Sequence, residues 1–175
     1  MAHPGAVSPV KFFVAVLWAP SAPLGSALES LRSMGGETDF AGPDHAFDST
    51  DYYELEMGGG LRRRLVSFSE LRPPDNLCAA KLSCNEIEDR LAAAKGRTVN
   101  LDIGYLDHNK IVLASCKGAG QKIYLGQGVW ADLIGRYRGG RYCPFEWTFP
   151  DFRDGRYDSE LGQMRRIYLG QLRNL

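Results

Sequence analysis

The chain has 175 residues, of which 44% are hydrophobic and 24% are charged, a composition typical of one globular domain that can bury a core. Lysine plus arginine and aspartate plus glutamate number 21 each, so the net charge provides no general attraction to nucleic acid or to anionic membranes. We therefore expect no nucleic-acid partner and no membrane association.

Residues 12–19 form the longest apolar run, which is too short to cross a bilayer. The first ten residues show no secretory signal pattern, so a cytoplasmic location is expected. The four cysteines lack the paired short spacing of a zinc or redox motif, and the three histidines lie far apart. We interpret the cysteines as reduced thiols that pack in or near the core.

The first 60 residues predict a strand, a helix and an irregular segment. Residues 10–18 are rich in β-branched and aromatic residues, which predicts a central strand. Apolar residues recur at helical spacing over residues 24–31, and a Gly-Gly pair that follows can end the helix. Residues 37–47 predict a short edge strand interrupted by a Gly-Pro pair, and residues 47–60 predict a long ordered loop.

The remainder of the chain predicts two helices and more strands. Residues 62–68 predict a strand, and a helix is predicted from about Asp75 to about Lys95, where Gly96 closes it. Helical spacing predicts a last helix over residues 157–172. Between these helices the β-patterned segments are residues 98–106, 110–116, 122–125, 129–137 and 141–145.

This order predicts an α+β fold with a mixed, largely antiparallel sheet. The order strand, helix, strand, strand, helix, strand is that of a ferredoxin-like βαββαβ unit, which a C-terminal β-meander and a final packing helix would extend. We expect residues 10–175 to form a single domain and residues 1–9 to be a disordered tail.

The first candidate site is an acidic stretch with two tyrosines. It contains the carboxylates Asp51, Glu54 and Glu56 with Tyr52 and Tyr53 among them. If the stretch is extended, Glu54 and Glu56 share one face, which is the minimum geometry for a divalent metal or for a general acid and base pair. The alternative is a surface loop that its tyrosines anchor on the core while its acids stay in water.

The second candidate site lies on a predicted strand. Asn100 and Asp102 share one face of it, which is either a polar site or a solvent-facing surface. Gly104 and Tyr105 beside them permit the close approach of a ligand or of another backbone segment, or else mark a bulge.

Helical spacing aligns Lys81, Asn85 and Glu88 along one stripe. A stripe of this kind can face a cleft, but we favour a solvated face with a weak ion pair.

Three further segments are weaker candidates. Residues 117–122 lack the spacing of a phosphate loop and predict a flexible turn. Residues 147–153 either stack a planar ligand or clamp the last helix; we favour the clamp for Trp147 and Phe149 and leave Asp151 open. Residues 62–64 are three arginines, but alternate side chains of a strand face opposite ways, so they form no single basic face.

Taken together, these segments resemble a bacterial family known only as domain of unknown function 4416. The resemblance covers residues 10 to about 172, and its motifs are TDYY at residues 50–53, EMG at 56–58, NLD at 100–102, GYL at 104–106, LAS at 113–115 and IYL at 123–125, with Phe47, Asp48, Lys81, Leu82, Asn85, Glu88, Gly128, Trp147, Thr148, Pro150 and Asp151. The chain departs from the family pattern at Ile103, where proline is expected, and at Gly120 and Gln121, where a histidine is expected.

Some members of that family carry the label "GTP-binding protein". The chain has neither a phosphate loop nor the guanine-reading motif [NT]KxD, so its motifs give this label no support.

The sequence leads to two hypotheses. The first is a cleft that binds a small polar ligand, phosphorylated or nucleotide-like, with Asp102 and Glu56 as general bases or metal ligands if there is catalysis. The ligand-binding candidates are Asp51, Tyr52, Tyr53, Asn85, Glu88, Asn100, Tyr105, Trp147 and Asp151. The second is a non-catalytic protein–protein interaction domain. The residues permit a divalent metal without identifying one, and they predict neither an enzyme class nor an oligomeric state.

Overall fold

The computed structural model describes residues 3–175, whose strands form one nine-stranded sheet. In chain order the elements are β1 Val10–Trp18, α1 Leu24–Gly35, β2 Thr38–Ala41, β3 His45–Ala46, α2 Glu54–Met57, β4 Arg62–Arg72, the 3₁₀ turn Pro74–Asn76, α3 Leu77–Arg90, β5 Val99–Leu106, β6 Lys110–Ser115, β7 Ile123–Gly126, β8 Val129–Arg138, β9 Arg141–Pro144, α4 Pro150–Arg153 and α5 Asp158–Leu172. Of the predicted tail, residues 1 and 2 lie outside the described residues, and residues 3–9 contain no helix or strand.

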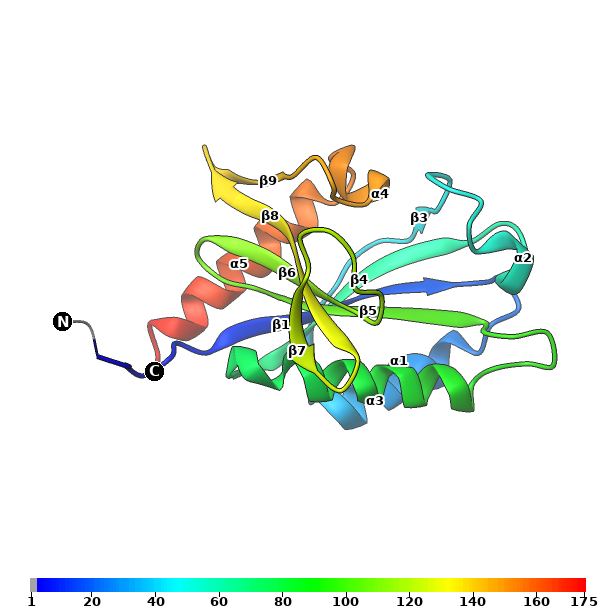
Figure 1. Ribbon diagram of the computed structural model, residues 1–175, viewed down its shortest axis with the longest axis horizontal. Coiled ribbons are helices and arrows are strands. Elements are labelled where there is room, and N and C mark those ends of the chain that lie inside the picture. Colours follow the sequence, from blue (N-terminus) through cyan, green and yellow to red (C-terminus); the bar gives the residue numbers. More distant parts are fainter. Residues whose placement is uncertain (1–2) are drawn as a thin grey trace.

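The first half of the chain has the predicted ferredoxin-like topology. The strands follow the order β2-β4-β1-β5, and each neighbouring pair is antiparallel. Helix α1 connects β1 to β2, and α3 connects β4 to β5, so the chain makes two crossovers on one face of the sheet (Figure 1). The short strand β3 is an addition that pairs with the beginning of β4.

The second half extends this antiparallel sheet, but its strands depart from the consecutive order of the predicted meander, because β7 lies beyond β8. Strand β6 pairs with β5 on one side and β8 on the other, and both β7 and β9 pair with β8. Helix α5 crosses the face of the sheet opposite to α1 and α3 (Figure 1). The α+β class, the largely antiparallel sheet and the final packing helix are therefore confirmed.

Strand β1 is buried along its whole length because the sheet has a helical layer on each side. Its even-numbered side chains, such as Val14, belong to the core under α1 and α3, whereas Phe13 and Ala15 on the opposite face belong to the core under α5. A third, smaller cluster at the end of β1 joins Leu17 to Phe47 and Met57. This cluster anchors the α2 segment beside the sheet.

Three element boundaries differ from the sequence prediction. Helix α3 ends at Arg90 because Ala93 and Gly96 pair in a tight backbone turn, which redirects a stretch of good helix formers. Strand β4 runs to Arg72, because its last residues pair with the beginning of β1. Residues 47–60 are not all loop, since α2 lies within them.

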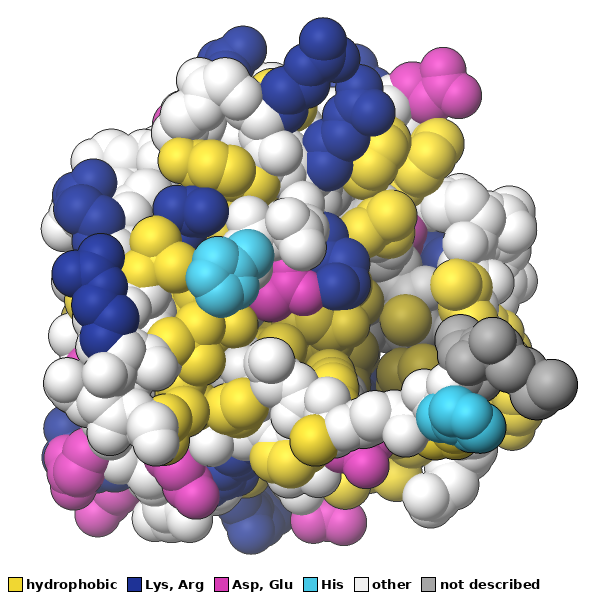
Figure 2. Space-filling view, turned by 90° about the vertical axis from the view of Figure 1, so that its left-hand side faces the viewer, with side chains coloured by type: hydrophobic (Ala, Val, Ile, Leu, Met, Phe, Trp, Pro, Cys, Tyr) yellow, Lys and Arg dark blue, Asp and Glu magenta, His cyan; other side chains and the backbone are white. Residues whose placement is uncertain are grey.

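The face of the molecule drawn in Figure 2 does not carry charges of a single sign. Lysine and arginine side chains, acidic side chains and hydrophobic side chains all appear on the face drawn there. This distribution agrees with the equal numbers of basic and acidic residues in the chain.

Candidate functional site

A cleft lies where β5 and β6 separate. The two strands pair only over Gly104–Leu106 and Ile111–Leu113 within the described residues, although β5 begins at Val99 and β6 continues to Ser115. The cleft has a volume of about 410 Å³, and its walls come from α3, β5, β6, the residues after β6 and the segment before α2. This volume lies in the range of small-molecule sites.

Gly104 is the point at which the two strands meet. A Cβ atom at this position would lie 2.3 Å from the backbone oxygen of Val112, so only glycine permits this approach. Residues 99–106 keep an uninterrupted register with β1, and the expectation of a bulge is therefore wrong. The close approach of another backbone segment is what the structure shows.

Helix α3 supplies hydrogen bonds to the edge of β5 that faces the cleft. Glu88 Oε1 accepts a hydrogen bond of 2.7 Å from the Leu101 N–H, and Lys81 Nζ donates one of 3.0 Å to the Leu101 carbonyl. Both side chains are buried, and their charged groups lie 3.6 Å apart. Side chains thus take the place of a strand, because buried backbone groups need partners. The solvated-face interpretation of this stripe is wrong.

Arg97 joins the α2 segment to the wall of the cleft. Its Nε donates to Glu56 Oε1 at 2.8 Å and its second terminal nitrogen donates to Glu56 Oε2 at 2.8 Å. Its first terminal nitrogen donates to Glu88 at 3.1 Å and to Asn100 Oδ1 at 2.8 Å. The hydrogen bond from Arg97 lowers the pKa of Glu56. Glu54 points elsewhere, because these residues form a helical turn and not an extended strand.

Asn100 presents a buried donor without a partner. The side chain is 4% exposed, and its Oδ1 already accepts from Arg97. This contact determines the orientation of the amide, so the Nδ2 group is directed away from Arg97. Nδ2 has no hydrogen-bond partner among the described residues, and Asn100 lines the cleft. An unsatisfied buried amide is costly, which makes this a place for a ligand or water oxygen.

Arg63 holds the acidic end of the cleft. It donates to Asp102 Oδ2 at 3.0 Å and to Asp151 Oδ2 at 2.5 Å, and its guanidinium carbon lies 4.6 Å from the centre of the Phe47 ring. Tyr157 also donates to Asp151, at 3.0 Å. Burial alone would lower the pKa of Arg63, but the charges of Asp151 and Asp102 raise it overall.

The sequence interpretation missed Arg63. It had considered the three arginines only as a possible basic surface. The signal was the same alternation that argued against this surface, because the middle arginine of a strand points away from its two neighbours and here toward the core. A buried arginine requires acidic partners.

Two tyrosines and a phenylalanine contribute rings to the cleft. Burial raises the pKa of Tyr53, so its phenol is a neutral donor. Tyr52 is exposed and hydrogen-bonds to the ammonium of Lys117, which also lies 4.4 Å from the centre of its ring. This hydrogen bond lowers the pKa of Tyr52. Phe149 is the third ring, and it is 43% exposed.

The wall opposite β5 carries a second polar group. Lys122 Nζ donates to Ser115 Oγ at 2.9 Å and lies 3.6 Å from Asp132 Oδ2. Gln121 Nε2 donates to Asp132 Oδ1 at 2.8 Å. Gln121 is one of the two residues found where the family pattern predicts a histidine. It therefore contacts a residue of the cleft wall.

The structure brings most of the predicted site residues together. Those that line the cleft are Tyr52, Tyr53, Asn85, Glu88, Asn100 and Asp102. Glu56 binds Arg97, which lines the cleft, and Asp151 binds Arg63, which also binds Asp102 of the cleft wall.

The other three predicted residues lie elsewhere. Tyr105 packs against Phe12 with the core under α3. Asp51 lines a separate, shallow cavity beside the α2 segment. Trp147 stacks on Phe145 with ring centres 4.8 Å apart.

The proposed clamp on the last helix is formed by a different residue. Trp147 and Phe149 are 40% and 43% exposed, so neither is a buried clamp. Phe152 is buried instead and packs on Tyr157 with the core under α5. The sequence placed the aromatic anchor in the right segment but on the wrong rings, because it did not show which side chains α4 turns inward.

Residues 3–175 contain no group of three histidine, cysteine, aspartate or glutamate side chains that could hold a metal ion. Glu56 and Asp102, the two suggested metal ligands, are each bound by an arginine. All four cysteines are free thiols. No helix in the described part of the chain is long and apolar enough to span a membrane.

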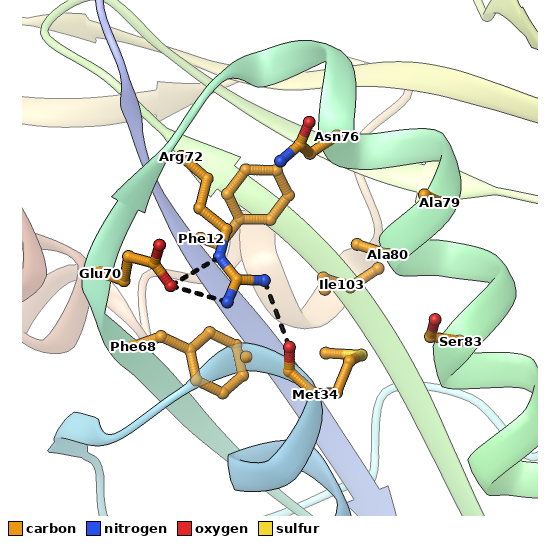
Figure 3. A pocket seen from close by; sticks show the side chains of 11 residues that line it. Phe12, Met34, Phe68, Glu70, Arg72, Asn76, Ala79, Ala80, Ser83 and Ile103 are labelled. Atoms are coloured by element: carbon orange, nitrogen blue, oxygen red, sulfur yellow. Dashed lines mark hydrogen bonds and ion pairs between the residues drawn. The ribbon is translucent and has the colours of Figure 1, made fainter.

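A further cavity, of about 300 Å³, lies between α1, α3 and the sheet (Figure 3). Its floor includes Phe12 and Phe68. Its charged side chains already have partners, since Arg72 donates to Glu70 at 2.8 Å and to the Met34 carbonyl at 3.2 Å. None of the residues predicted for the site lines it. The cleft between β5 and β6 is therefore the stronger candidate.

Residues 8–168 match the sequence profile of the family described as Domain of unknown function (DUF4416). The chain belongs to this family. The match confirms the resemblance that the motifs of the sequence indicated. Searches of the curated proteins and of the solved structures gave no match. Because the family description assigns no activity, function has to be argued from the cleft itself.

Proposed function

We propose that this protein binds a small polar ligand in the cleft between β5 and β6. The observation that carries the proposal is the Asn100 amide, whose Nδ2 group is buried, directed away from Arg97 and without a partner among residues 3–175. Folded proteins rarely leave such a donor unpaired, and a ligand acceptor atom at this position would remove its cost.

The surroundings of Asn100 suit a phosphorylated or nucleotide-like compound. Tyr52 and Phe149 offer exposed rings for stacking, and Lys117 and Lys122 offer ammonium groups. The phenol of Tyr53 is a further neutral donor, since burial raises its pKa.

If the ligand is also transformed, Asp102 is the better candidate for the general base. Glu56 is held by two hydrogen bonds from Arg97 to its two carboxylate oxygens. Asp102 receives one hydrogen bond from Arg63 on Oδ2, and its Oδ1 has no hydrogen-bond partner in the described chain. A base needs such an accessible oxygen to accept a proton.

Asn100→Asp tests the proposal with little change of shape. The variant keeps an oxygen for Arg97 and replaces the free donor by an acceptor. Thermal unfolding would be followed with a panel of nucleotides, sugar phosphates and divalent metals, and native mass spectrometry would search for a co-purified ligand. A ligand at about 100 times its Kd raises the Tm by about 5–10 °C.

We expect this shift in the unmodified protein and its loss in Asn100→Asp. The matched control is Asn174→Asp, at an exposed position near the C-terminus, which should bind as the unmodified protein does. The proposal fails if no compound stabilises the unmodified protein and none co-purifies with it.

The second candidate function is a protein–protein interaction domain, and one observation favours it. Strand β7 exposes Ile123, Tyr124 and Leu125, and in the described chain no strand pairs with its outer edge. An apolar edge strand is a surface on which a partner can add a strand. If no compound binds the cleft in the Asn100 experiment, that result would favour the interaction function.

A further inference from the structure

The charged groups in and beside the cleft fall into three sets of partners. In the first set Lys81 and Arg97 face Glu56 and Glu88, so two cations meet two anions. This group has no excess charge. It satisfies the edge of β5 and orients Asn100, and its charged atoms are already occupied by each other.

The second set has an excess of negative charge. One guanidinium, that of Arg63, faces the two carboxylates of Asp102 and Asp151. The Asp151 side chain is almost fully buried, whereas that of Asp102 is 22% exposed and lines the cleft. The excess charge therefore acts on the cleft through Asp102, whose Oδ1 has no partner among the described residues.

The third set contains two ammonium groups, those of Lys117 and Lys122, and one carboxylate, that of Asp132. Lys122 pairs with Asp132, whereas the charge of Lys117 acts on Glu56 and contributes to the lowered pKa of that carboxyl. Lys117 forms no ion pair within residues 3–175 and contacts the phenol of Tyr52 instead. Ser115 lies between the two lysines, since its Oγ accepts from Lys122 Nζ at 2.9 Å and from the Lys117 backbone N–H at 3.1 Å. Its hydroxyl donates to the Lys117 carbonyl at 3.2 Å.

One more charged residue borders the cleft. Asp89 is exposed on the last turn of α3, where solvent screens its charge. The lining thus offers an accepting carboxylate oxygen at Asp102, a neutral donor at Asn100 and ammonium donors at Lys117 and Lys122.

We propose that the ligand is a hydroxylated phosphate monoester, of the sugar phosphate class. Its phosphate would lie at Lys117 and Lys122, because a dianion with three terminal oxygens can accept from two ammonium groups. A hydroxyl group would donate to Asp102, and another ligand oxygen would accept from Asn100. This inference rests on the proposed function and names the ligand class of the same cleft.

The arrangement also requires Lys117 to leave Tyr52. A bound phosphate would offer this ammonium a charged acceptor in place of a neutral phenol, and hydrogen bonds to charged groups are the stronger ones. Binding should then raise the pKa of Tyr52, since the hydrogen bond from Lys117 is the main reason that it is low.

Isothermal titration calorimetry on the full chain tests the class. The titrants are pentose and hexose phosphates, the same sugars without phosphate, the corresponding sugar acids, free amino acids and inorganic phosphate. We expect a sugar phosphate to bind at least about tenfold more tightly than its parent sugar and than inorganic phosphate. Only the ester can contact both the two lysines and Asp102.

Two variants test the phosphate contact of Lys117 and the hydroxyl contact of Asp102. Lys117→Gln should weaken binding of the phosphate ester by about tenfold or more while leaving the parent sugar unaffected, and Lys95→Gln, at an exposed turn outside the cleft, is its matched control. Asp102→Asn should weaken ester and parent sugar alike. Circular dichroism and the Tm would show that each variant is folded.

Spectrophotometric titration of Tyr52, with Tyr52→Phe as the blank, provides a readout besides affinity. The pKa of Tyr52 should rise in Lys117→Gln and on binding of the ester.

The possible outcomes separate this inference from the function on which it rests. Tighter binding of a sugar acid, an amino acid or an uncharged sugar, or an unchanged affinity in Lys117→Gln, would overturn the phosphate assignment while a ligand dependent on Asn100 would still support the cleft. A complete absence of binding and of any co-purified compound would overturn both.

Discussion

Replacing Arg63 by methionine is the sharpest test of how the acidic end of the cleft is built. Methionine has a similar length but no charge, so Asp151 and Asp102 would lose their common cation. The Arg63 and Asp151 side chains are 3% and 2% exposed, which leaves water little access to the abandoned carboxylate. Tyr157 would remain as a neutral donor to Asp151.

Removing one partner of a buried ion pair costs about 3–5 kcal/mol, because it leaves an uncompensated charge. A chain of this size has a free energy of unfolding of about 5–15 kcal/mol, so the loss is a large part of the total. We expect a fall in Tm of about 6–20 °C and an equivalent loss in urea unfolding at pH 7.5. Arg62→Met, at the exposed neighbouring position, should change the free energy of unfolding by less than about 0.5 kcal/mol.

The loss in Arg63→Met should depend on the charge of Asp151, which is buried and would have no cation beside it. In Arg63→Met with Asp151→Asn the charge is absent, and the double variant should be more stable than the sum of the two single changes predicts.

Two results would refute this reasoning. One is a loss below about 1 kcal/mol in Arg63→Met, which is what an exposed pair gives. The other is strict additivity of the two changes. Either would mean that Asp151 does not depend on Arg63 for its charge.

Two other predictions concern the geometry and the electrostatics around the cleft. Gly104→Ala should lower the free energy of unfolding by about 1–3 kcal/mol, because its Cβ would meet the Val112 backbone oxygen at 2.3 Å; Gly25→Ala, in open space on α1, should be neutral or stabilising in the same urea titration. Glu56→Gln should lower the Tm at pH 7. Arg97 lowers the folded pKa of Glu56, so the stabilisation is present above the unfolded pKa and is lost as the pH falls through the folded one. The Tm difference from the unmodified protein should therefore shrink as the pH falls below the ordinary pKa of a glutamate, and a constant difference from pH 7 to pH 3 would contradict this role.

Local sequence patterns were sufficient for the longer helices and strands and for the topology of the first half of the sheet, but they did not show the short helices α2 and α4. Strand β1 and helix α5 follow from β-branched runs and helical spacing, which act within a few residues of the chain. Two boundaries depended on distant contacts: the end of β4 extends because β1 pairs with it, and α3 stops where the turn at Gly96 leads to Arg97.

The sequence also predicted six of the residues that line the cleft, because their polar and aromatic groups stood out among apolar neighbours. It could not assign their partners. Asp102 and Asp151 are 39 and 88 residues from Arg63, and the spacing of charges along a chain carries no information about such pairs.

The cleft itself is a property of the tertiary structure. Helical spacing placed Lys81 and Glu88 on one stripe, but only the separation of β5 from β6 leaves Leu101 for them to bind. Likewise, the sequence contained Asn100 without showing that Arg97 would occupy its oxygen and leave its nitrogen free. Local patterns determine which face of an element a side chain occupies, whereas the packing of elements decides which buried polar groups meet and which remain unpaired.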